Sequence, residues 1–310
     1  MEFTLKRAKG VLQIKRKMMD RLSYIKENLV SENNVISLQN TNFSEIAQSI
    51  RSGKHKLNIE SINFPINLFN DFLVKVDYKK NYPNYYREFG PPNNTECNFI
   101  SKCYEHFFSF QLANIKKGKT VADIACSNSP VHKILSDFYG CEEVFRQDLQ
   151  FSQNHPLVIA QVNRLIGGDA SNLRVESEKF DALLLHNSWE HFEGESDLKF
   201  LFEAERILKK GGIVAIIPLF LSEQTYQVTS PSIWHSKYPT LKYSYPLFDL
   251  KHPIVVDDSI EQRMVKYLSV ETLFRYSEKV RSLKFKIFYI ADFKEYDFIK
   301  FPFSLIIQKR

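Results

Sequence analysis

Apolar and polar residues are arranged along the chain in blocks that predict helices and strands in turn from about residue 99 onward. Between Phe99 and Ile115, apolar side chains recur at helical spacing, and Lys116-Lys117-Gly118 supplies a cationic last turn and a terminating glycine. Further helices are expected to start at Ser129-Pro130, at Ser196 and at Ser269. Short apolar runs predict strands at 120–125, 143–147, near 166, 180–185 and 213–217.

Strands that alternate with helices at this spacing predict βαβ units and a doubly wound parallel sheet, so the fold class is α/β. The glycine pair Gly211-Gly212 is expected to end the helix that starts at Ser196. The last two β-rich segments, 284–290 and 298–308, are expected to form an antiparallel pair.

The pattern divides the chain into two regions. Residues 95–310 carry the α/β pattern, with an aromatic and proline-punctuated insert at 221–268 that we interpret as a substrate lid. Residues 1–94 are predicted to be a mainly helical N-terminal region with a polar linker at 31–60. Residues 1–30 form a basic amphipathic stretch, which either packs on the core or contacts an acidic partner or membrane surface.

Composition narrows the class of protein without naming a function. The chain has 310 residues, 44% hydrophobic and 25% charged, which are values of a globular protein. A net charge of +6 permits an anionic partner but does not require nucleic acid, and no RNA-binding motif is present. Four scattered cysteines, the absence of a signal-peptide pattern and an apolar run of only nine residues at 213–221 predict a cytoplasmic protein.

Polar residues follow each predicted strand, where a doubly wound sheet binds its ligands. An acidic residue after the second strand suits a ribose diol, because a carboxylate accepts both hydroxyl protons, and the helix start at Ser129 offers free amides to an anion. The strand-end segments are Asp123–Pro130, Gln147–Leu149, Gly168–Ala170 and His186–His191.

These segments resemble the class I S-adenosylmethionine-dependent methyltransferases, of the type 11 kind. Residues 121–126 read VADIAC, similar to the family's first motif V-L-D-I-G-C-G-x-G, and 168–173 read GDASNL, similar to G-D-A-x-x-L. Residues 180–185 with 189–192 resemble the fourth motif, and 205–212, ERILKKGG, are close to the family's entry to strand five. The resemblance implies a seven-stranded Rossmann-like sheet whose last strand is antiparallel, with S-adenosylmethionine as cofactor.

The resemblance also implies where that cofactor binds. Asp123 and the backbone of 125–129 would hold the methionine end, Asp148 the ribose, and Asp169 with the Ala170 amide the adenine. Asp148 and Asp169 could instead be turn or cap residues. The full set of candidate cofactor-binding residues is Asp123, Ala125, Cys126, Ser127, Asn128, Ser129, Gln147, Asp148, Asp169, Ala170, His186 and Asn187.

The first loop departs from the family, because the three motif glycines are replaced by Ala125, Ser127 and Ser129. Glycine usually permits a positive φ and close approach of a ligand, so we expect a modified loop in which Asn128 takes the left-handed conformation. Either the loop still binds the cofactor or the domain is a non-catalytic scaffold that binds a partner.

Candidate catalytic residues cluster after the fourth strand. His191 is the first choice for a general base, Glu190 the alternative, and His186 a third candidate. Related O-methyltransferases hold magnesium with E-x-x-E-H, but Asn187 stands at the first position here, so no metal is expected. The acceptor is expected to be a small molecule or glycan methylated on oxygen, and the lid aromatics, among them Tyr226 and Trp234, either stack on it or form a small core.

Overall fold

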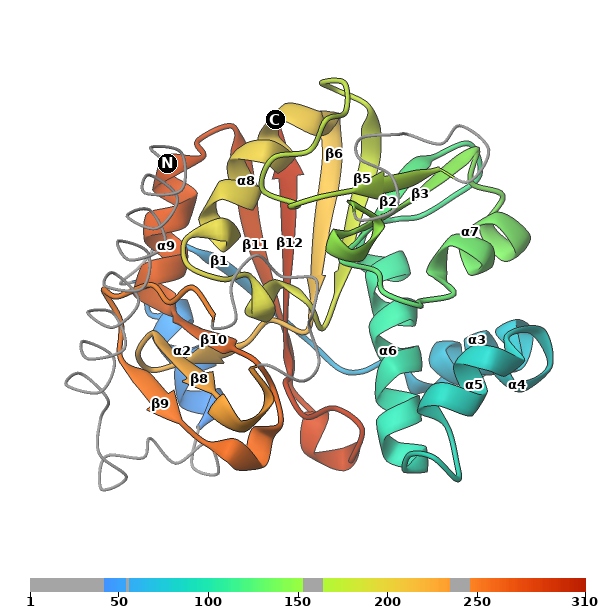
Figure 1. Cartoon of the computed structure of the whole chain (residues 1–310), viewed down its shortest axis with the longest axis horizontal. Helices are drawn as coiled ribbons and strands as arrows, with labels where there is room; N and C mark the ends of the chain where they lie inside the picture. The colour runs from blue at the N-terminus through green and yellow to red at the C-terminus, as the bar shows by residue number, and fades with distance from the viewer. Residues whose placement is uncertain (1–41, 54–55, 153–163, 235–245) are drawn as a thin grey trace, which may run out of the picture.

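In the computed structural model, the described residues are 42–53, 56–152, 164–234 and 246–310. They form a mixed sheet of eight strands with helices on both faces, and a second sheet of four strands at one end (Figure 1). The basic stretch predicted at 1–30 lies outside the described residues, as do residues 31–41 and 54–55 of the predicted linker. The described part of that linker was wrongly predicted, because it forms the helix α2 Phe43–Arg51 and the first residues of β1.

The large sheet has the strand order β1-β11-β12-β6-β5-β2-β3-β4. Strands β2 to β6 are parallel, and β12 is antiparallel to both β6 and β11, which confirms the doubly wound sheet with an antiparallel last strand. The bounds are β1 Asn58–Ile62, β2 Thr120–Ile124, β3 Glu143–Asp148, β4 Leu165–Gly167, β5 Phe180–His186, β6 Leu208–Ile217, β11 Leu283–Ile290 and β12 Phe303–Lys309.

The N-terminal region contributes more than the predicted helices. Strand β1 pairs in parallel with β11, with Asn58 opposite Lys286 and Ile62 opposite Ile290, and adds an eighth strand to the expected seven. The division of the chain at residues 94 and 95 stays a prediction, but this pairing and the packing of the first helices on α6 join the two regions closely.

Helices cover the sheet in two sets (Figure 1). One face packs on α2 Phe43–Arg51, α8 Ser196–Ile207 and α9 Val270–Lys279. The other face packs on α3 Ile66–Val76, α4 Tyr78–Asn81, α5 Pro83–Phe89, α6 Glu96–Leu112 and α7 Val131–Tyr139. Alternate residues of one strand face the two sets: Ala122 and Ile124 of β2 lie in the first core, and Val121 lies in the second.

The predicted helix starts are confirmed to within a residue or two. Ser269 caps α9, since its side chain accepts a hydrogen bond from the Thr272 amide at 3.1 Å. The Ser129 hydroxyl accepts from the Val131 amide at 3.2 Å, and α7 begins at Val131, one residue after the proline.

The expected role of Gly211-Gly212 was wrong. The helix α8 ends at Ile207, and the glycines lie within β6. Phe180 pairs with Leu208 and Ala182 with Ile213, so residues 209–212 form a bulge. Gly211 has φ +77°, and a Cβ at Gly212 would lie 2.8 Å from the Lys209 carbonyl, which explains why this bulge uses glycine.

The predicted lid contains regular structure. It forms a four-stranded sheet in the order β7-β10-β8-β9, with β7 Leu221–Ser222, β8 Tyr226–Thr229, β9 Ile254–Val256 and β10 Val265–Ser269. The lid sheet lies beside the ends of β6 and β12 at the lower left of Figure 1. It therefore borders the carboxyl ends of the parallel strands.

Candidate active site

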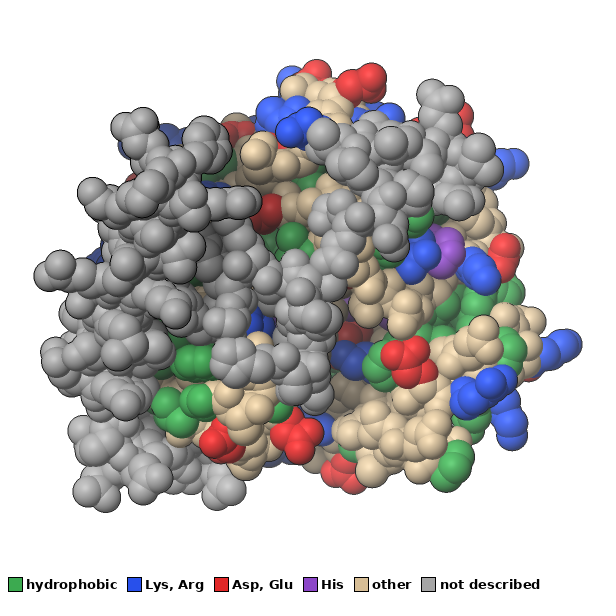
Figure 2. Space-filling model, in the orientation of Figure 1, with side chains coloured by type: hydrophobic (Ala, Val, Ile, Leu, Met, Phe, Trp, Pro, Cys, Tyr) green, Lys and Arg blue, Asp and Glu red, His purple; other side chains and the backbone are tan. Residues whose placement is uncertain are grey.

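A cavity lies at the carboxyl ends of β2 and β5, between the large sheet and the helices α5 and α6. These two strands are neighbours, and the chain changes direction across the sheet between them, so the cavity lies at the topological switch point. It encloses about 560 Å³ including open solvent. Figure 2 shows acidic and basic side chains meeting in a hollow beside α6. The lining residues are Tyr85, Phe89, Lys102, Glu105, His106, residues 123–129, His186 and Asn187.

Asp123, at the end of the central strand β2, is only 1% exposed. Its Oδ1 lies 3.3 Å from Nδ1 of His186, and Nε2 of that histidine lies 2.7 Å from the Ser109 hydroxyl on α6. Oδ2 is buried and has no hydrogen-bond partner among the described residues. A buried carboxylate oxygen without a partner is costly, so this atom marks a position suited to a cationic group.

His186 has no ring nitrogen free to act as a general base. Both ring nitrogens are occupied, by Asp123 and by Ser109, and the side chain is 7% exposed. These contacts fix the orientation of the Asp123 carboxylate, which is the role of a positioning residue.

The first loop keeps a glycine-like backbone without glycine. Ala125 has φ +51° and Ser127 has φ +45°, both in the left-handed region, at two of the three positions where the resembled family has glycine. The expectation that Asn128 would take this conformation was wrong, because its φ is not positive. The loop therefore carries strain at two positions that bear a Cβ.

Polar side chains of β3 hold this strained loop. The buried amide of Gln147 accepts from the Ala125 N–H at 3.0 Å and donates to the Gly168 carbonyl at 2.6 Å. Asp148 accepts from the Ser127 N–H at 2.8 Å, and the Arg146 guanidinium donates to the Ser127 carbonyl at 2.8 Å. Gln147 thus ties three strand ends together.

The candidate nucleoside-binding residues lie outside the lining of this cavity. Asp148 accepts a second backbone hydrogen bond from Gln150, which leaves a lone pair on each carboxylate oxygen. Asp169 is exposed, accepts from the Ser171 amide at 2.9 Å, and so is a turn residue here, while Ala170 is buried in the core.

The opposite wall of the cavity comes from α5 and α6, and sequence analysis missed it. Tyr85 and Phe89 supply aromatic rings whose centroids are 4.7 Å apart, and Lys102 lies 3.4 Å from the buried Glu105. Desolvation raises the pKa of the Glu105 carboxyl, and the Lys102 ammonium opposes that shift. A signal was present: residues 102, 105, 106 and 109 are polar and recur at helical spacing opposite the apolar stripe.

A chain of polar contacts leaves this wall and crosses the cavity edge. The Asn187 amide, oriented to satisfy both ends, accepts from Lys102 Nζ at 3.3 Å and donates to Glu190 Oε1 at 3.2 Å. His191 Nε2 lies 3.6 Å from the same Glu190 oxygen, and its Nδ1–H donates to the Met264 carbonyl at 2.7 Å. The structure therefore brings Glu190 and His191 together, beside a residue that lines the cavity.

Burial dominates the electrostatics of this pair. Glu190 is 5% exposed, and desolvation raises the pKa of its carboxyl to about 8. Desolvation lowers the pKa of His191, although 34% of its side chain is exposed. Near neutral pH, Glu190 is therefore largely protonated and His191 largely neutral.

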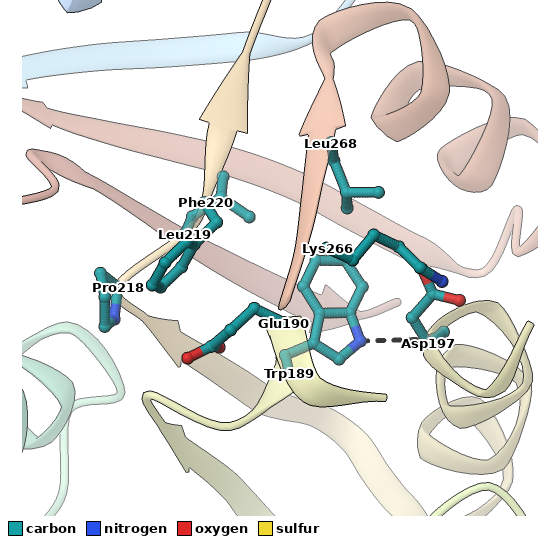
Figure 3. A pocket seen from close by; sticks show the side chains of 8 residues that line it. All are labelled: Trp189, Glu190, Asp197, Pro218, Leu219, Phe220, Lys266 and Leu268. Carbon is teal, nitrogen blue, oxygen red and sulfur yellow. Dashed lines mark hydrogen bonds and ion pairs between the residues drawn. The ribbon is translucent and has the colours of Figure 1, made fainter. Parts of the chain in front are cut away.

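A second, smaller pocket lies between η4 Trp189–His191, the end of β6 and the lid. Pro218, Leu219, Phe220 and Leu268 give it an apolar lining, with Lys266 and Asp197 at one side. Figure 3 shows the Glu190 carboxyl pointing away from Lys266 and Asp197 and toward Pro218. Trp189 is buried, and its indole N–H donates to the Asp197 carbonyl at 3.3 Å, so it packs rather than faces a ligand.

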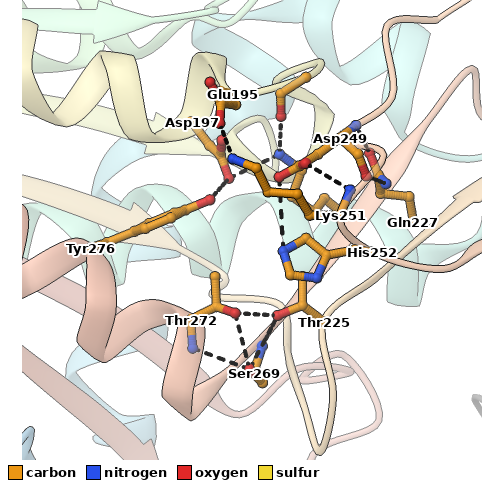
Figure 4. Close-up of polar contacts among 12 residues, drawn as sticks. Glu195, Asp197, Thr225, Gln227, Asp249, Lys251, His252, Ser269, Thr272 and Tyr276 are labelled. Atoms are coloured by element: carbon orange, nitrogen blue, oxygen red, sulfur yellow. Dashed lines mark hydrogen bonds and ion pairs between the residues drawn. The ribbon is translucent and has the colours of Figure 1, made fainter.

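The lid is joined to the segment after η4 by three acid–base pairs. Glu195 pairs with Lys251 on the surface, and Glu193 pairs with Arg263 at 2.6 Å. The third pair is buried: Lys266, 3% exposed, lies 3.0 Å from Asp197, which also accepts from the Tyr276 hydroxyl at 2.9 Å (Figure 4). Breaking a buried pair leaves an uncompensated charge, so this pair fixes the lid firmly to α8.

The described lid aromatics form a small core, one of the two alternatives expected from sequence. Tyr226 and Tyr267 stack at 4.7 Å within the small cluster that includes Phe220. The Trp234 indole N–H donates to the Thr229 hydroxyl at 2.8 Å. Residues 235–245, with four more of the aromatic or histidine candidates, lie outside the described residues.

Two features are absent from the described residues. No group of three or more histidine, cysteine or acidic side chains is arranged to hold a metal ion within residues 42–53, 56–152, 164–234 and 246–310. None of the helices in those same ranges is long and apolar enough to span a membrane.

Comparison with known proteins finds a family match within the large sheet. Residues 122–216 match a family described as "Methyltransferase domain". This match runs from β2 to the end of β6 and so includes Asp123, the strained loop and Glu190. No curated protein matches the chain by sequence.

Solved structures with a similar arrangement have low identity. Burkholderia thailandensis 1,6-didemethyltoxoflavin-N1-methyltransferase is 11% identical, with 80% of this chain and 91% of that chain covered at a TM-score of 0.44. The Pyrococcus horikoshii PH0226 protein is 16% identical, with 73% and 99% covered at 0.41. Haemonchus contortus phosphoethanolamine N-methyltransferase 2 is 14% identical, with 78% and 60% covered at 0.42. At these scores the assignment rests on the family match.

The first prediction concerns the strain in the loop. Ala125→Gly and Ser127→Gly should each raise the free energy of unfolding by about 1 kcal/mol, because a left-handed conformation costs a residue with a Cβ about 1–2 kcal/mol. Chemical denaturation of the purified variants measures this. Ser129→Gly is the matched control: its φ is not positive and its hydroxyl accepts from Val131, so it should give no gain. An equal gain at all three positions would contradict the strain.

The second prediction concerns the proton on Glu190. Because the folded pKa of about 8 exceeds that of the unfolded chain, the unfolded state binds fewer protons between these values, and stability falls as pH rises from about 5 to about 8. Glu190→Gln removes this loss, so the variant should gain about 3 kcal/mol relative to wild type between pH 5 and pH 8. Urea unfolding at both pH values measures the difference, with the exposed Glu142→Gln as control. A constant difference between wild type and Glu190→Gln would show that Glu190 titrates normally.

Proposed function

We propose that this protein transfers a methyl group to oxygen on a small molecule or glycan, because residues 122–216 match the methyltransferase-domain family. S-adenosylmethionine is the methyl donor of that family. The observation that carries the proposal is Asp123 Oδ2, a buried and unpartnered carboxylate oxygen that faces the cavity at the edge of the first loop.

The residues present fit such a cofactor. The ammonium of the methionine moiety would satisfy Asp123 Oδ2, and the backbone of residues 125–129 would hold the same end of the molecule. Asp148 keeps a lone pair on each oxygen for the ribose hydroxyls. Asp169 and the Ala170 amide are proposed for the adenine, although Asp169 is also a turn residue. When bound, the cofactor supplies an electrophilic methyl group.

The geometry favours Glu190 over His191 as the group that removes the acceptor proton. Asn187, which lines the cavity, holds the Glu190 carboxyl by a hydrogen bond, whereas His191 lines neither pocket. His191 lies behind Glu190 with Nε2 at 3.6 Å and is partly exposed, so it can pass a proton from Glu190 to solvent. Lys102 and Asn187 orient the carboxyl from the other side.

The proposal of a small hydroxyl-bearing acceptor follows from the proton affinity of Glu190 and the apolar residues beside it. A hydroxyl group needs a base as the new bond forms, and a carboxyl with a pKa of about 8 is matched to proton transfer near neutral pH. The apolar residues Pro218, Leu219 and Phe220 beside Glu190 suit the carbon skeleton of a small acceptor. The described lid aromatics pack against one another, and this packing does not favour stacking of these rings on a sugar.

The alternative function is a non-catalytic scaffold of the same fold that binds a partner protein. The loss of three glycines from the first motif favours it. Against it stand the left-handed φ values of Ala125 and Ser127, since a loop without a ligand has no need to keep a strained backbone. Binding of the cofactor separates the two functions directly.

The third prediction tests cofactor binding. Calorimetric titration with S-adenosylmethionine and with S-adenosylhomocysteine should show one site. Asp123→Asn and Asp148→Asn should each weaken binding by about 1.5–3 kcal/mol, the scale for a hydrogen bond to a charged group. Asp71→Asn, on the exposed surface of α3, is the control and should bind like wild type. Absence of binding to the wild-type protein would favour the scaffold.

The fourth prediction tests the base once an acceptor is found. Glu190→Gln should lower kcat by about 10²–10⁴, the usual contribution of general-base catalysis, with the affinity for the neutral product S-adenosylhomocysteine nearly unchanged. His191→Asn should lower kcat less and shift its pH dependence, because His191 would only relay the proton. A full loss in His191→Asn with normal turnover in Glu190→Gln would reverse the two roles.

A further inference from the structure

Asn187 connects the cavity to a carboxyl group that lies outside it. Its side chain lines the cavity and donates to Glu190 Oε1 at 3.2 Å, while its oxygen accepts from Lys102 at 3.3 Å. Asn187 has φ +46°, and its side chain lies between the Lys102 ammonium and the Glu190 carboxyl. A charge placed in the cavity therefore acts on Glu190 across a single amide.

The surroundings of Glu190 hold little compensating positive charge. Within the described residues, no lysine or arginine forms an ion pair with Glu190, and the Lys102 ammonium reaches it through the Asn187 amide and also pairs with Glu105. The neighbouring Lys266 is engaged by Asp197.

Other titratable groups face Glu190 from both sides. His191, on the same short helix, has a pKa lowered by desolvation, and Tyr267 of β10 is a phenol whose pKa is raised by burial and by Glu190 itself. Neither of these two groups is charged at neutral pH. From α6, the Lys102 ammonium lowers the pKa of Glu190 and the Glu105 carboxyl raises it, so the two oppose each other and an added cation would be the main new influence on the Glu190 proton.

We propose that Glu190 is protonated in the free protein and releases this proton when the sulfonium-bearing cofactor binds, so that the base exists only in the donor complex. This inference rests on the proposed function. S-adenosylmethionine carries a positive sulfur that S-adenosylhomocysteine lacks, and a cation near a desolvated carboxylate favours its ionised form. The neutral product would give no such release.

With this release, the protons balance over one turnover. Glu190 loses its proton to solvent on donor binding and then accepts the acceptor's hydroxyl proton as the carbon–oxygen bond forms and the carbon–sulfur bond breaks. The positive charge on sulfur and the negative charge on Glu190 disappear together. Glu190 is protonated again when the products leave, as in the free protein, so the single proton released per methyl transfer appears at the binding step.

The test is calorimetric titration at pH 7 in buffers of different protonation enthalpy, which counts protons released per ligand bound. Wild type should release about 0.4–0.9 proton more than Glu190→Gln with S-adenosylmethionine, the range for a shift of about 1–3 pKa units from 8. With S-adenosylhomocysteine, wild type and Glu190→Gln should agree. The comparison with Glu190→Gln cancels protons taken up by the ligand's own amino group.

Glu105→Gln tests the other buried carboxyl of the cavity lining, which has a raised pKa itself and also raises the pKa of Glu190. It should reduce the proton release in part without abolishing it, because Glu190 still carries the proton. If the release disappears in Glu105→Gln and persists in Glu190→Gln, the proposal is overturned and the proton belongs to Glu105.

A second measurement needs no variant and decides the matter if Glu190→Gln does not fold. The ratio of S-adenosylmethionine affinity to S-adenosylhomocysteine affinity should rise with pH, by at most about tenfold per unit, and level off above pH 8. A ratio independent of pH, with both ligands bound, overturns this inference and leaves the methyltransferase proposal intact. Failure of both ligands to bind overturns the proposed function and this inference with it.

Discussion

The buried carboxylate of Asp123 is the constraint on which the site depends. Its strand lies at the centre of the sheet, so Asp123 is buried, and His186 at the end of the next strand contacts one of its oxygens. Ser109 of α6 fixes that histidine in turn, which sets the position of α6 over the strand ends. The unpartnered second oxygen then faces the cavity that α6 closes. Sheet, helix and cavity are thus joined by one short chain of hydrogen bonds.

Hydrogen bonds from neighbouring side chains also hold the strained residues of the first loop. Ala125 and Ser127 stay in the left-handed region because Gln147 and Asp148 accept their amide protons, and both acceptors come from the adjacent strand β3. A loop without glycine therefore holds two residues in a conformation that favours glycine. The cost falls on stability, and this strained conformation is the reason to favour ligand binding over a scaffold.

On the other side of the cavity, ion pairs attach the lid to the segment that follows Glu190. Residues 193–197, which lead from η4 into the first turn of α8, present three carboxylates, and Arg263, Lys251 and Lys266 of the lid each bind one of them. The innermost pair is fully buried and joined to Tyr276, so the lid and the segment carrying Glu190 form one unit. The same burial that fixes this segment removes water from Glu190 and raises the pKa of its carboxyl. Position and proton affinity of the candidate base therefore have a common cause.

The sequence by itself determined the order of strands and helices from residue 99, the polar strand ends and the altered first motif, because periodicity and turn residues are local properties. It also indicated the Glu190–His191 pair. Only the tertiary structure decided that β1 extends the sheet, that Gly211 and Gly212 form a bulge, and that Lys102 and Glu105 face the cavity. The sequence could not predict the proton affinity of Glu190, since it arises from burial beside Pro218, Leu219, Phe220 and the lid and from the charges of α6. Burial and charge at Glu190 depend on segments that are far apart in the sequence, and no local pattern encodes that proximity.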